Sequence, residues 1–97
     1  MILNKIKKEP NYSILKFKLG TRTPIKCPKI VKFLDVQVQD GKVVMWVLCD
    51  LNATEEEYII HCIGTGWSEI YINKPDNYIA TTQVGEYVWH FFWERID

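Results

Sequence analysis

Apolar and polar side chains alternate with a period of two over much of the chain, whereas helical periodicity is weak throughout. Residues 12–19 (YSILKFKL) place three apolar side chains on one face and two lysines on the other, which predicts a half-buried strand that ends at Gly20. Residues 23–28 (TPIKCP) carry a proline near each end, so we expect an extended segment at a sheet edge.

The strongest pattern lies in residues 31–50 (VKFLDVQVQDGKVVMWVLCD), where Asp40-Gly41 separates two β-rich runs. This residue pair suits a two-residue type I′ hairpin, because both loop positions take positive φ. With that loop, one face of the hairpin carries three apolar cross-strand pairs: Val38 with Val43, Val36 with Met45, and Leu34 with Val47. The second strand is apolar on both faces, so we expect it to be central and the first strand to flank it.

A second hairpin is predicted in residues 77–96 (NYIATTQVGEYVWHFFWERI). A type II′ turn at Gly85-Glu86 gives three cross-strand pairs: Val84 with Tyr87, Thr82 with Trp89, and Ala80 with Phe91. Residues 57–63 (EYIIHCI) predict a further buried strand. Residues 51–57 form a connection, in which the capping-box spacing of Thr54 and Glu57 suits a short helical turn.

Together these segments predict a single all-β domain over residues 1–97, with about six mostly antiparallel strands in a small sandwich or a partly open barrel. The apolar fraction of 47% and the aromatic fraction of 13% suffice for a core and are too high for a disordered chain.

The charges cancel overall but are segregated along the chain. Twelve basic and twelve acidic residues give a net charge of zero, which argues against a general nucleic-acid-binding protein. Nine of the basic residues precede residue 35, among them Lys5, Lys7 and Lys8, and eight of the acidic residues follow residue 54, among them Glu69 and Asp97. Two explanations fit: lysines that protect edge strands from aggregation, or a basic surface that attracts an anionic partner.

Cysteine usage and the N-terminal sequence indicate the compartment. Cys27, Cys49 and Cys62 show no CxxC and no regular spacing, which favours a reducing compartment over a disulfide framework. The first residues, MILNKIKKEP, have no apolar core long enough for a signal peptide, and no run approaches the length of a membrane span. We therefore expect a cytosolic protein that does not contact a membrane.

The sequence contains no recognisable catalytic motif. His61 and His90 each lie inside an apolar strand, where a structural histidine is commoner than a catalytic one. Adjacent strand residues point to opposite faces, so His61 and Cys62 do not form a dyad, and a cross-strand pairing of His90 with Cys49 or Cys62 is left open. No spacing supports three converging metal ligands. We expect no metal, no cofactor and no enzymatic activity.

Residues 61–67 (HCIGTGW) end an apolar run in two glycines that flank Thr65 and precede Trp67. The segment is too short for a phosphate loop or a dinucleotide fingerprint, and no helical pattern follows it. Two interpretations remain. The glycines form a bend that only ends a strand, or Gly64, Thr65 and Gly66 offer backbone N–H groups that bind an anion.

The last predicted strand is apolar on both faces, with Trp89, Phe91 and Trp93 on one face and His90 and Phe92 on the other. Three interpretations fit this pattern: a core strand packed on both sides, an aromatic wall that stacks a planar ligand, and a dimer interface.

Several short motifs resemble, in the same order, those of a family of small uncharacterised proteins of tailed bacteriophages and prophages. The motifs are PIKCP, DVQVQDG, MWVLCD, IGTGW, YIATTQVG and HFFWE, and the resemblance covers roughly residues 12–94. Trp67 stands where the family pattern has histidine, and Ala80 where it has glycine, so a role of that histidine does not carry over. The resemblance implies a virus-encoded accessory protein of the bacterial cytoplasm, similar to inhibitors that block a host defence protein or sequester a nucleotide signal.

We therefore expect a non-enzymatic, homo-oligomeric protein that binds a small anionic, nucleotide-like ligand or a host defence protein. The predicted ligand-binding residues are Gly64, Thr65, Gly66, Trp67, Trp89, Arg22 and Lys26. In this hypothesis the glycine turn supplies backbone donors, the tryptophans stack the planar part, and the basic residues neutralise phosphate. The alternative is a structural or assembly protein of the virion, or a protein–protein adaptor.

Overall fold

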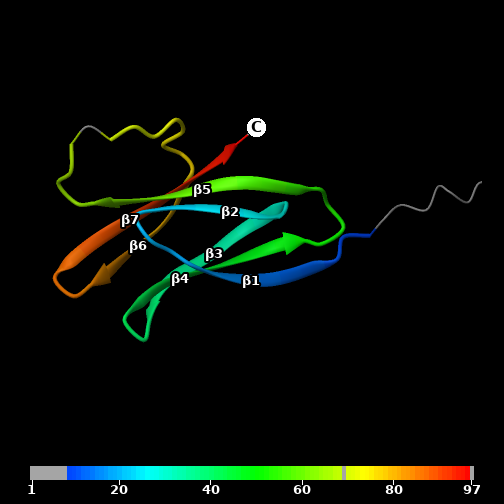
Figure 1. Ribbon diagram of the computed structural model, residues 1–97, viewed down its shortest axis with the longest axis horizontal. Helices are drawn as coiled ribbons and strands as arrows, with labels where there is room; N and C mark the ends of the chain where they lie inside the picture. The colour runs from blue at the N-terminus through cyan, green and yellow to red at the C-terminus, as the bar shows by residue number, and fades with distance from the viewer. Residues whose placement is uncertain (1–8, 69, 97) are drawn as a thin grey trace, which may run out of the picture.

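The computed structural model describes residues 9–68 and 70–96. The predicted basic residues Lys5, Lys7 and Lys8 and the acidic residues Glu69 and Asp97 lie outside this part. The described residues form seven strands and no helix (Figure 1). The strands are β1 (Tyr12–Lys18), β2 (Arg22–Pro28), β3 (Ile30–Gln39), β4 (Lys42–Asp50), β5 (Glu55–Gly64), β6 (Tyr78–Val84) and β7 (Tyr87–Ile96).

The strands belong to two antiparallel sheets that pack face to face. Sheet A has the order β1-β4-β3 and sheet B the order β2-β5-β7-β6 (Figure 1). The sheets do not close on each other, so the fold is a sandwich and not a barrel. The predicted all-β fold is confirmed, as are the central position of β4 and the edge position of the proline-containing strand β2.

The chain crosses from sheet B to sheet A at Lys29, between β2 and β3. The Lys29 N–H donates to the Thr54 carbonyl at 3.2 Å, and the Lys29 carbonyl accepts from the Asp50 N–H at 3.1 Å. One residue therefore contacts both ends of the connection between β4 and β5. This crossing ties the two sheets together at one end of the sandwich.

Both predicted hairpins are present, because their turn residues adopt the required dihedrals. Asp40 and Gly41 have φ values of 51° and 74°, as a type I′ turn demands. Gly85 has a φ of 62°, which fits the first loop position of a type II′ turn. The three predicted cross-strand pairs between β6 and β7 are confirmed.

The predicted pairing of Leu34 with Val47 is wrong. A register shift between Phe33 and Asp35 places Phe33 opposite Val47, and Leu34 is 40% exposed. A bulge inserts one extra residue and exchanges the faces of the side chains beyond it. The large ring of Phe33 thereby turns towards the core, where Tyr58 and Trp93 lie.

The predicted helical turn at residues 54–57 is also wrong, because β5 begins at Glu55. Capping-box spacing is a local signal, and here the Thr54 carbonyl instead accepts the N–H of Lys29 from the strand crossing. The run Glu55–Glu57 is consequently part of a strand rather than a solvated loop.

The core lies between the sheets and is built from alternate residues of the central strands. Its fully buried side chains are Met45, Val47, Cys49, Ile60 and Phe91. On β1, Leu15 and Phe17 pack against this cluster, which confirms the predicted half-buried strand. The burial pattern follows directly from the period-two alternation of the sequence.

We predict that Phe91→Ala lowers the free energy of unfolding by about 3–5 kcal/mol, because it leaves a cavity beneath β7. Phe91 is 1% exposed, whereas Tyr71 is 85% exposed, so Tyr71→Ala serves as the aromatic control. That control is expected to change the stability by less than about 0.5 kcal/mol. Urea unfolding followed by tryptophan fluorescence measures both, and equal losses would contradict the assigned core.

Candidate ligand-binding site

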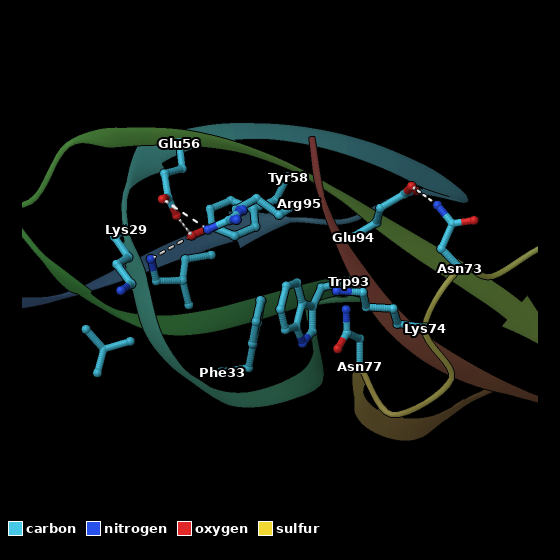
Figure 2. A pocket seen from close by; sticks show the side chains of 12 residues that line it. Lys29, Phe33, Glu56, Tyr58, Asn73, Lys74, Asn77, Trp93, Glu94 and Arg95 are labelled. Carbon is cyan, nitrogen blue, oxygen red and sulfur yellow. Dashed lines mark hydrogen bonds and ion pairs between the residues drawn. The ribbon is translucent and has the colours of Figure 1, made fainter. Parts of the chain in front are cut away.

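A cavity lies between the two sheets, lined by residues of β3, β5 and β7 (Figure 2). Its volume is about 530 Å³. Strand β3 forms one wall, β5 and β7 form the other, and the connection between β5 and β6 covers one end. The lining residues are Lys29, Ile30, Val31, Phe33, Glu56, Tyr58, Asn73, Lys74, Asn77, Trp93, Glu94 and Arg95.

Three aromatic rings form the apolar wall of this cavity. Phe33 and Trp93 stack with ring centroids 5.4 Å apart at an interplanar angle of 23°. Tyr58 meets both rings edge-on, at 6.5 Å from Phe33 and 6.2 Å from Trp93. The bulge in β3 is what brings Phe33 to this cluster. Stacked and edge-on pairs are both favourable for ring quadrupoles, so the three rings stabilise one another.

The hydroxyl of Tyr58 fixes the floor of the cavity. It accepts the backbone N–H of Ile30 at 2.9 Å and donates to Oε1 of Glu56 at 2.7 Å. Oε2 of Glu56 in turn lies 3.4 Å from Nη1 of Arg95. Burial, together with the neighbouring Glu56, raises the pKa of Tyr58 to about 12, so the hydroxyl stays protonated and remains a donor.

The second carboxylate of the cavity, Glu94, also has partners within the protein. Its Oε1 lies 3.0 Å from Nε2 of His61 on β5. Its Oε2 accepts a hydrogen bond from Nδ2 of Asn73 at 2.6 Å, and Asn73 belongs to the connection between β5 and β6. Glu94 thus links that connection to sheet B.

Two lysines at the cavity have no such partners in the part of the chain that the structure describes. Neither Lys29 nor Lys74 makes a side-chain hydrogen bond or ion pair with any residue in the ranges described above. Figure 2 shows Lys29 on one side of the Phe33–Trp93 pair and Lys74 on the other. Lys29 is placed by the strand crossing, and Lys74 by a turn in which its carbonyl accepts the Asn77 N–H at 2.9 Å. The cavity therefore combines an aromatic wall with two ammonium groups.

The predicted glycine segment lies elsewhere, at the far end of β5. The N–H of Thr65 donates to the Val88 carbonyl and the N–H of Trp67 to the Gly64 carbonyl, both at 3.2 Å. Of the three N–H groups predicted to bind an anion, that of Thr65 is thus used within the fold. The segment offers fewer donors than its sequence suggests.

The structure gives the glycines a steric role instead. A Cβ atom on Gly64 would lie 2.6 Å from Nε1 of Trp67 and 3.0 Å from Cζ3 of Trp89, so only glycine leaves room for the indole. Gly66 has a φ of 86°, which completes the turn. Trp67 and Trp89 meet edge-on with centroids 5.4 Å apart. These residues are brought together, as predicted, but as a packing cluster.

The predicted basic residues do not join this cluster. Arg22 is opposite His61 on the outer face of sheet B, whereas Trp89 packs against the core on the inner face. Lys26 is opposite Glu57 on β5. Glu57 is seven residues from Gly64 along this strand, which corresponds to about 23 Å at the usual rise per residue. Arg22 and Lys26 were predicted as ligand-binding residues from their charge alone. The register of β2 separates both of them from the tryptophans.

A second, smaller hollow of about 290 Å³ lies beside the glycine segment. Three isoleucines, Trp67 and Phe92 line it, together with Thr65 and His90. The two nitrogens of His90 contact hydroxyls on either side: Oγ1 of Thr65 at 2.7 Å and Oγ1 of Thr81 at 3.0 Å. Among the described residues no Asp, Glu, Lys or Arg lines this hollow, so it offers no ammonium or guanidinium group to a phosphate.

The last strand packs into the core on one face only, so the predicted packing on both sides is not confirmed. Phe91 on the inner face is fully buried, whereas His90 and Phe92 on the other face are half-buried and line the smaller hollow. Trp93 is only half-buried and forms part of the cavity wall, which sequence periodicity alone did not separate from the core. Trp93 belongs to the predicted aromatic wall, whereas Lys29, Phe33 and Lys74 were missed. The missed residues lie at the strand crossing, on β3 and in the connection between β5 and β6, and no local motif connects them.

A sequence model of the family described as Domain of unknown function (DUF7352) matches residues 11–96. The chain belongs to the DUF7352 family. The match includes all seven strands of the DUF7352 protein and both hollows. Searches of curated proteins and of solved structures found no match to this DUF7352 chain.

Two further observations concern the residues that the structure describes. They contain no helix long and apolar enough to cross a membrane. They also contain no cluster of three His, Cys, Asp or Glu side chains placed to hold a metal ion. The buried Cys27 and Cys49 lie with their Sγ atoms 3.9 Å apart, and burial raises the pKa of both thiols, that of Cys27 to about 12.

We predict that Gly64→Ala displaces Trp67, because the new Cβ cannot share its place with the indole. The expected result is a changed near-ultraviolet circular dichroism spectrum and a loss of about 1–3 kcal/mol of stability. Gly20→Ala is the matched control, since its Cβ would meet only Oγ1 of Thr23 at 4.0 Å. Neither glycine has a positive φ, so the comparison isolates the steric contact.

We also predict that the free energy of unfolding falls as the pH rises from about 9 to about 12. Folding raises the pKa of Cys27 from 9.0 and that of Tyr58 from 10.0, each to about 12. As the pH rises, the unfolded chain therefore loses these protons before the folded protein does. The stabilisation from each group is fully present below its pKa in the unfolded chain and is lost as the pH rises towards its pKa in the folded protein. Urea midpoints measured across this pH range test it. If the free energy of unfolding of a Cys27→Ala/Tyr58→Phe variant fell equally steeply with pH, the prediction would be contradicted.

Proposed function

We propose that this DUF7352 protein is a non-catalytic binding protein for a small anionic ligand with a planar part, and that the ligand occupies the cavity between β3, β5 and β7. One observation carries this proposal. The cavity joins a stacked aromatic pair to two ammonium groups without partners among the described residues, while both of its carboxylates are already engaged.

The charge balance of the cavity favours an anion. Lys29, Lys74 and Arg95 contribute three positive charges, and Glu56 and Glu94 contribute two negative ones, so the sum over the lining residues is 3 − 2 = +1. Glu56 faces Arg95, and Glu94 is held by its histidine and asparagine neighbours. The excess positive charge therefore resides at the two lysines. Lysine ammonium groups are common ligands of phosphate.

The aromatic wall suits a planar group such as a nucleobase. Trp93 and Phe33 present rings at the cavity, and stacking on such a side chain contributes about 1–3 kcal/mol per base. Asn77 also lines the cavity, and its amide has both a donor and an acceptor for the edge of a base. A nucleotide-like ligand would use all three kinds of contact.

The chemistry of the cavity supports binding rather than turnover. Tyr58 has a raised pKa and is held between Ile30 and Glu56, so it is a poor base or nucleophile. His61 contacts Glu94 and lies outside the cavity lining. A protein that sequesters a ligand needs affinity and no catalytic group.

The resemblance to proteins of tailed phages and prophages supports a biological setting for this activity. We propose that the protein acts as a virus-encoded accessory protein in the bacterial cytoplasm and sequesters a nucleotide-like signal of host defence. This setting depends on the sequence resemblance and not on the cavity.

A second candidate function is that of an adaptor or virion assembly protein, and a different surface favours it. Trp67, Tyr71 and Tyr87 are 50%, 85% and 69% exposed at one end of the sandwich. Exposed tryptophan and tyrosine residues are enriched in protein contact surfaces. Mass spectrometry of purified virions distinguishes this function, because a structural protein is present at stoichiometric copy number.

We predict that isothermal titration with a panel of linear and cyclic nucleotides gives saturable heat for at least one of them. Trp93→Phe keeps a ring in the wall and is expected to weaken binding about threefold, whereas Trp93→Ala weakens it at least about tenfold through lost stacking. Lys29→Gln and Lys74→Gln each weaken binding up to about fivefold at low salt.

The matched controls remove the same charge outside the cavity. Lys26 and Lys42 lie on strands away from it, so Lys26→Gln and Lys42→Gln should leave the affinity unchanged. A loss of affinity with Lys26→Gln and none with Lys29→Gln would indicate that the ligand binds at the residues predicted from the sequence instead. No heat with any nucleotide would eliminate the proposal of a nucleotide-like ligand.

A further inference from the structure

The two sheets have four edges in the described part of the chain: β1 and β3 in sheet A, and β2 and β6 in sheet B. An edge strand presents unpaired backbone N–H and C=O groups, which pair readily with another strand. Folded proteins therefore protect such edges with prolines, bulges, short strands or charges. Three of the four edges carry prolines or bulges here, whereas β1 carries neither and has only its lysines.

Strand β2 is protected by its prolines. The Thr21 carbonyl accepts the Cys62 N–H from β5 at 2.9 Å, so odd-numbered residues of this segment face β5 and even-numbered residues face outward. Pro24 and Pro28 both occupy outward positions, and neither has an N–H. Two of the outward backbone donors of β2 are thus missing.

Strands β3 and β6 are protected by irregular register and by each other. β3 has register shifts between Ile30 and Lys32 and between Phe33 and Asp35. β6 has one between Tyr78 and Ala80. The two strands also contact each other across the sandwich. A bulged edge is a poor template for a regular ladder.

Strand β1 is regular, and in the described part of the chain its outer edge is unpaired. Its seven residues contain neither proline nor glycine, and they pair with β4 in one unbroken register from Tyr12 to Lys18. The Leu19 N–H donates to the Val43 carbonyl at 2.9 Å, so odd-numbered residues face β4. The backbone groups that face outward belong to Tyr12, Ile14, Lys16 and Lys18.

We propose that β1 pairs antiparallel with β1 of a second copy of this chain, about a two-fold axis at Leu15, so that sheet A continues across a symmetric dimer. In this register all the outward N–H and C=O groups of the four residues are paired. Ile14 lies opposite Lys16 of the partner subunit, and Tyr12 opposite Lys18 of the partner subunit. The contact is isologous, as a two-fold axis requires.

The lysines select this register. A shift of two residues in one direction sets Lys16 opposite Lys16 of the partner subunit, and like charges directly opposite each other are destabilising. The same shift in the other direction sets Lys18 opposite Pro10 of the partner subunit, which has no N–H. With the axis at Leu15, each lysine faces an apolar or aromatic side chain, over which its methylene groups pack. The lysines also disfavour pairing with other basic strands.

The dimer leaves the cavity open. β1 and β3 are opposite edges of sheet A, and the cavity lies at β3. The proposal is therefore independent of ligand binding, and each copy in the dimer keeps its own cavity.

Sedimentation velocity over a range of concentrations tests the proposal, with two substitutions of opposite charge at one position. Ile14 is 60% exposed, so the monomer tolerates either change. Ile14→Lys faces Lys16 of the partner subunit and is expected to raise the dimer dissociation constant at least about tenfold. Ile14→Glu faces the same lysine with opposite charge and is expected to keep the dimer. Equal weakening by both substitutions, or a wild-type protein that stays monomeric, would overturn the proposed register.

A proline pair tests the backbone contact separately. Ile14→Pro removes an outward N–H that has no partner among the described residues, and it is expected to abolish the dimer while circular dichroism stays that of a β protein. Lys26→Pro removes an outward N–H from the already blocked edge of β2 and is expected to leave the dimer intact. In the wild type, the outward amides of Ile14, Lys16 and Lys18 should exchange hydrogen more slowly as concentration rises. A dimer that survives Ile14→Pro would rule out pairing through β1.

Discussion

The hydrogen bond from the Ile30 N–H to the Tyr58 hydroxyl holds the two sheets in their relation to each other. Ile30 begins β3 in sheet A, immediately after the chain has left sheet B, and Tyr58 lies in the middle of the facing layer on β5. A buried N–H without a partner is costly, so the hydroxyl stabilises the crossing and fixes where β3 starts. The position of Lys29, the bulge that turns Phe33 inward and the opening of the cavity all follow from that starting point. The same hydroxyl donates to Glu56, which connects the crossing to the charged side of the cavity.

The two hairpins could be predicted because their determinants are local. Asp40-Gly41 and Gly85-Glu86 fix turn dihedrals within two residues, and the register of the flanking strands follows from the turn. The bulge at Leu34 lacks such a signal. Leu34 and Phe33 are both apolar, so alternation allows either to face the core, and the choice depends on rings from β5 and β7 that are distant in sequence. Local patterns therefore identified the strands but not the side chains that shape the cavity.

The candidate site was missed for a related reason. Two glycines in a short segment are conspicuous in a sequence, whereas a cavity assembled from a strand crossing, a bulge and a turn has no motif. Lys29 and Lys74 are separated by most of the chain and are brought to one cavity only by the strand order 2-5-7-6 and by the connection after β5. Charge segregation along the sequence identified the basic residues of the first third, but neighbours in three dimensions decide which of them lack carboxylate partners. For Lys26 that neighbour is Glu55, 3.9 Å away, and Lys29 has no such neighbour in the described residues.

The contact between Gly64 and Trp67 has a consequence for how this sequence can change. The indole occupies the space in which a side chain at residue 64 would lie, so the two positions share one fixed volume. A larger residue at one position requires a smaller ring at the other, and neither substitution is tolerated easily before its counterpart. Substitutions at residues 64 and 67 are therefore expected to occur together. Among members of the family, the size of the ring after the second glycine should vary inversely with the size of the residue that ends the strand.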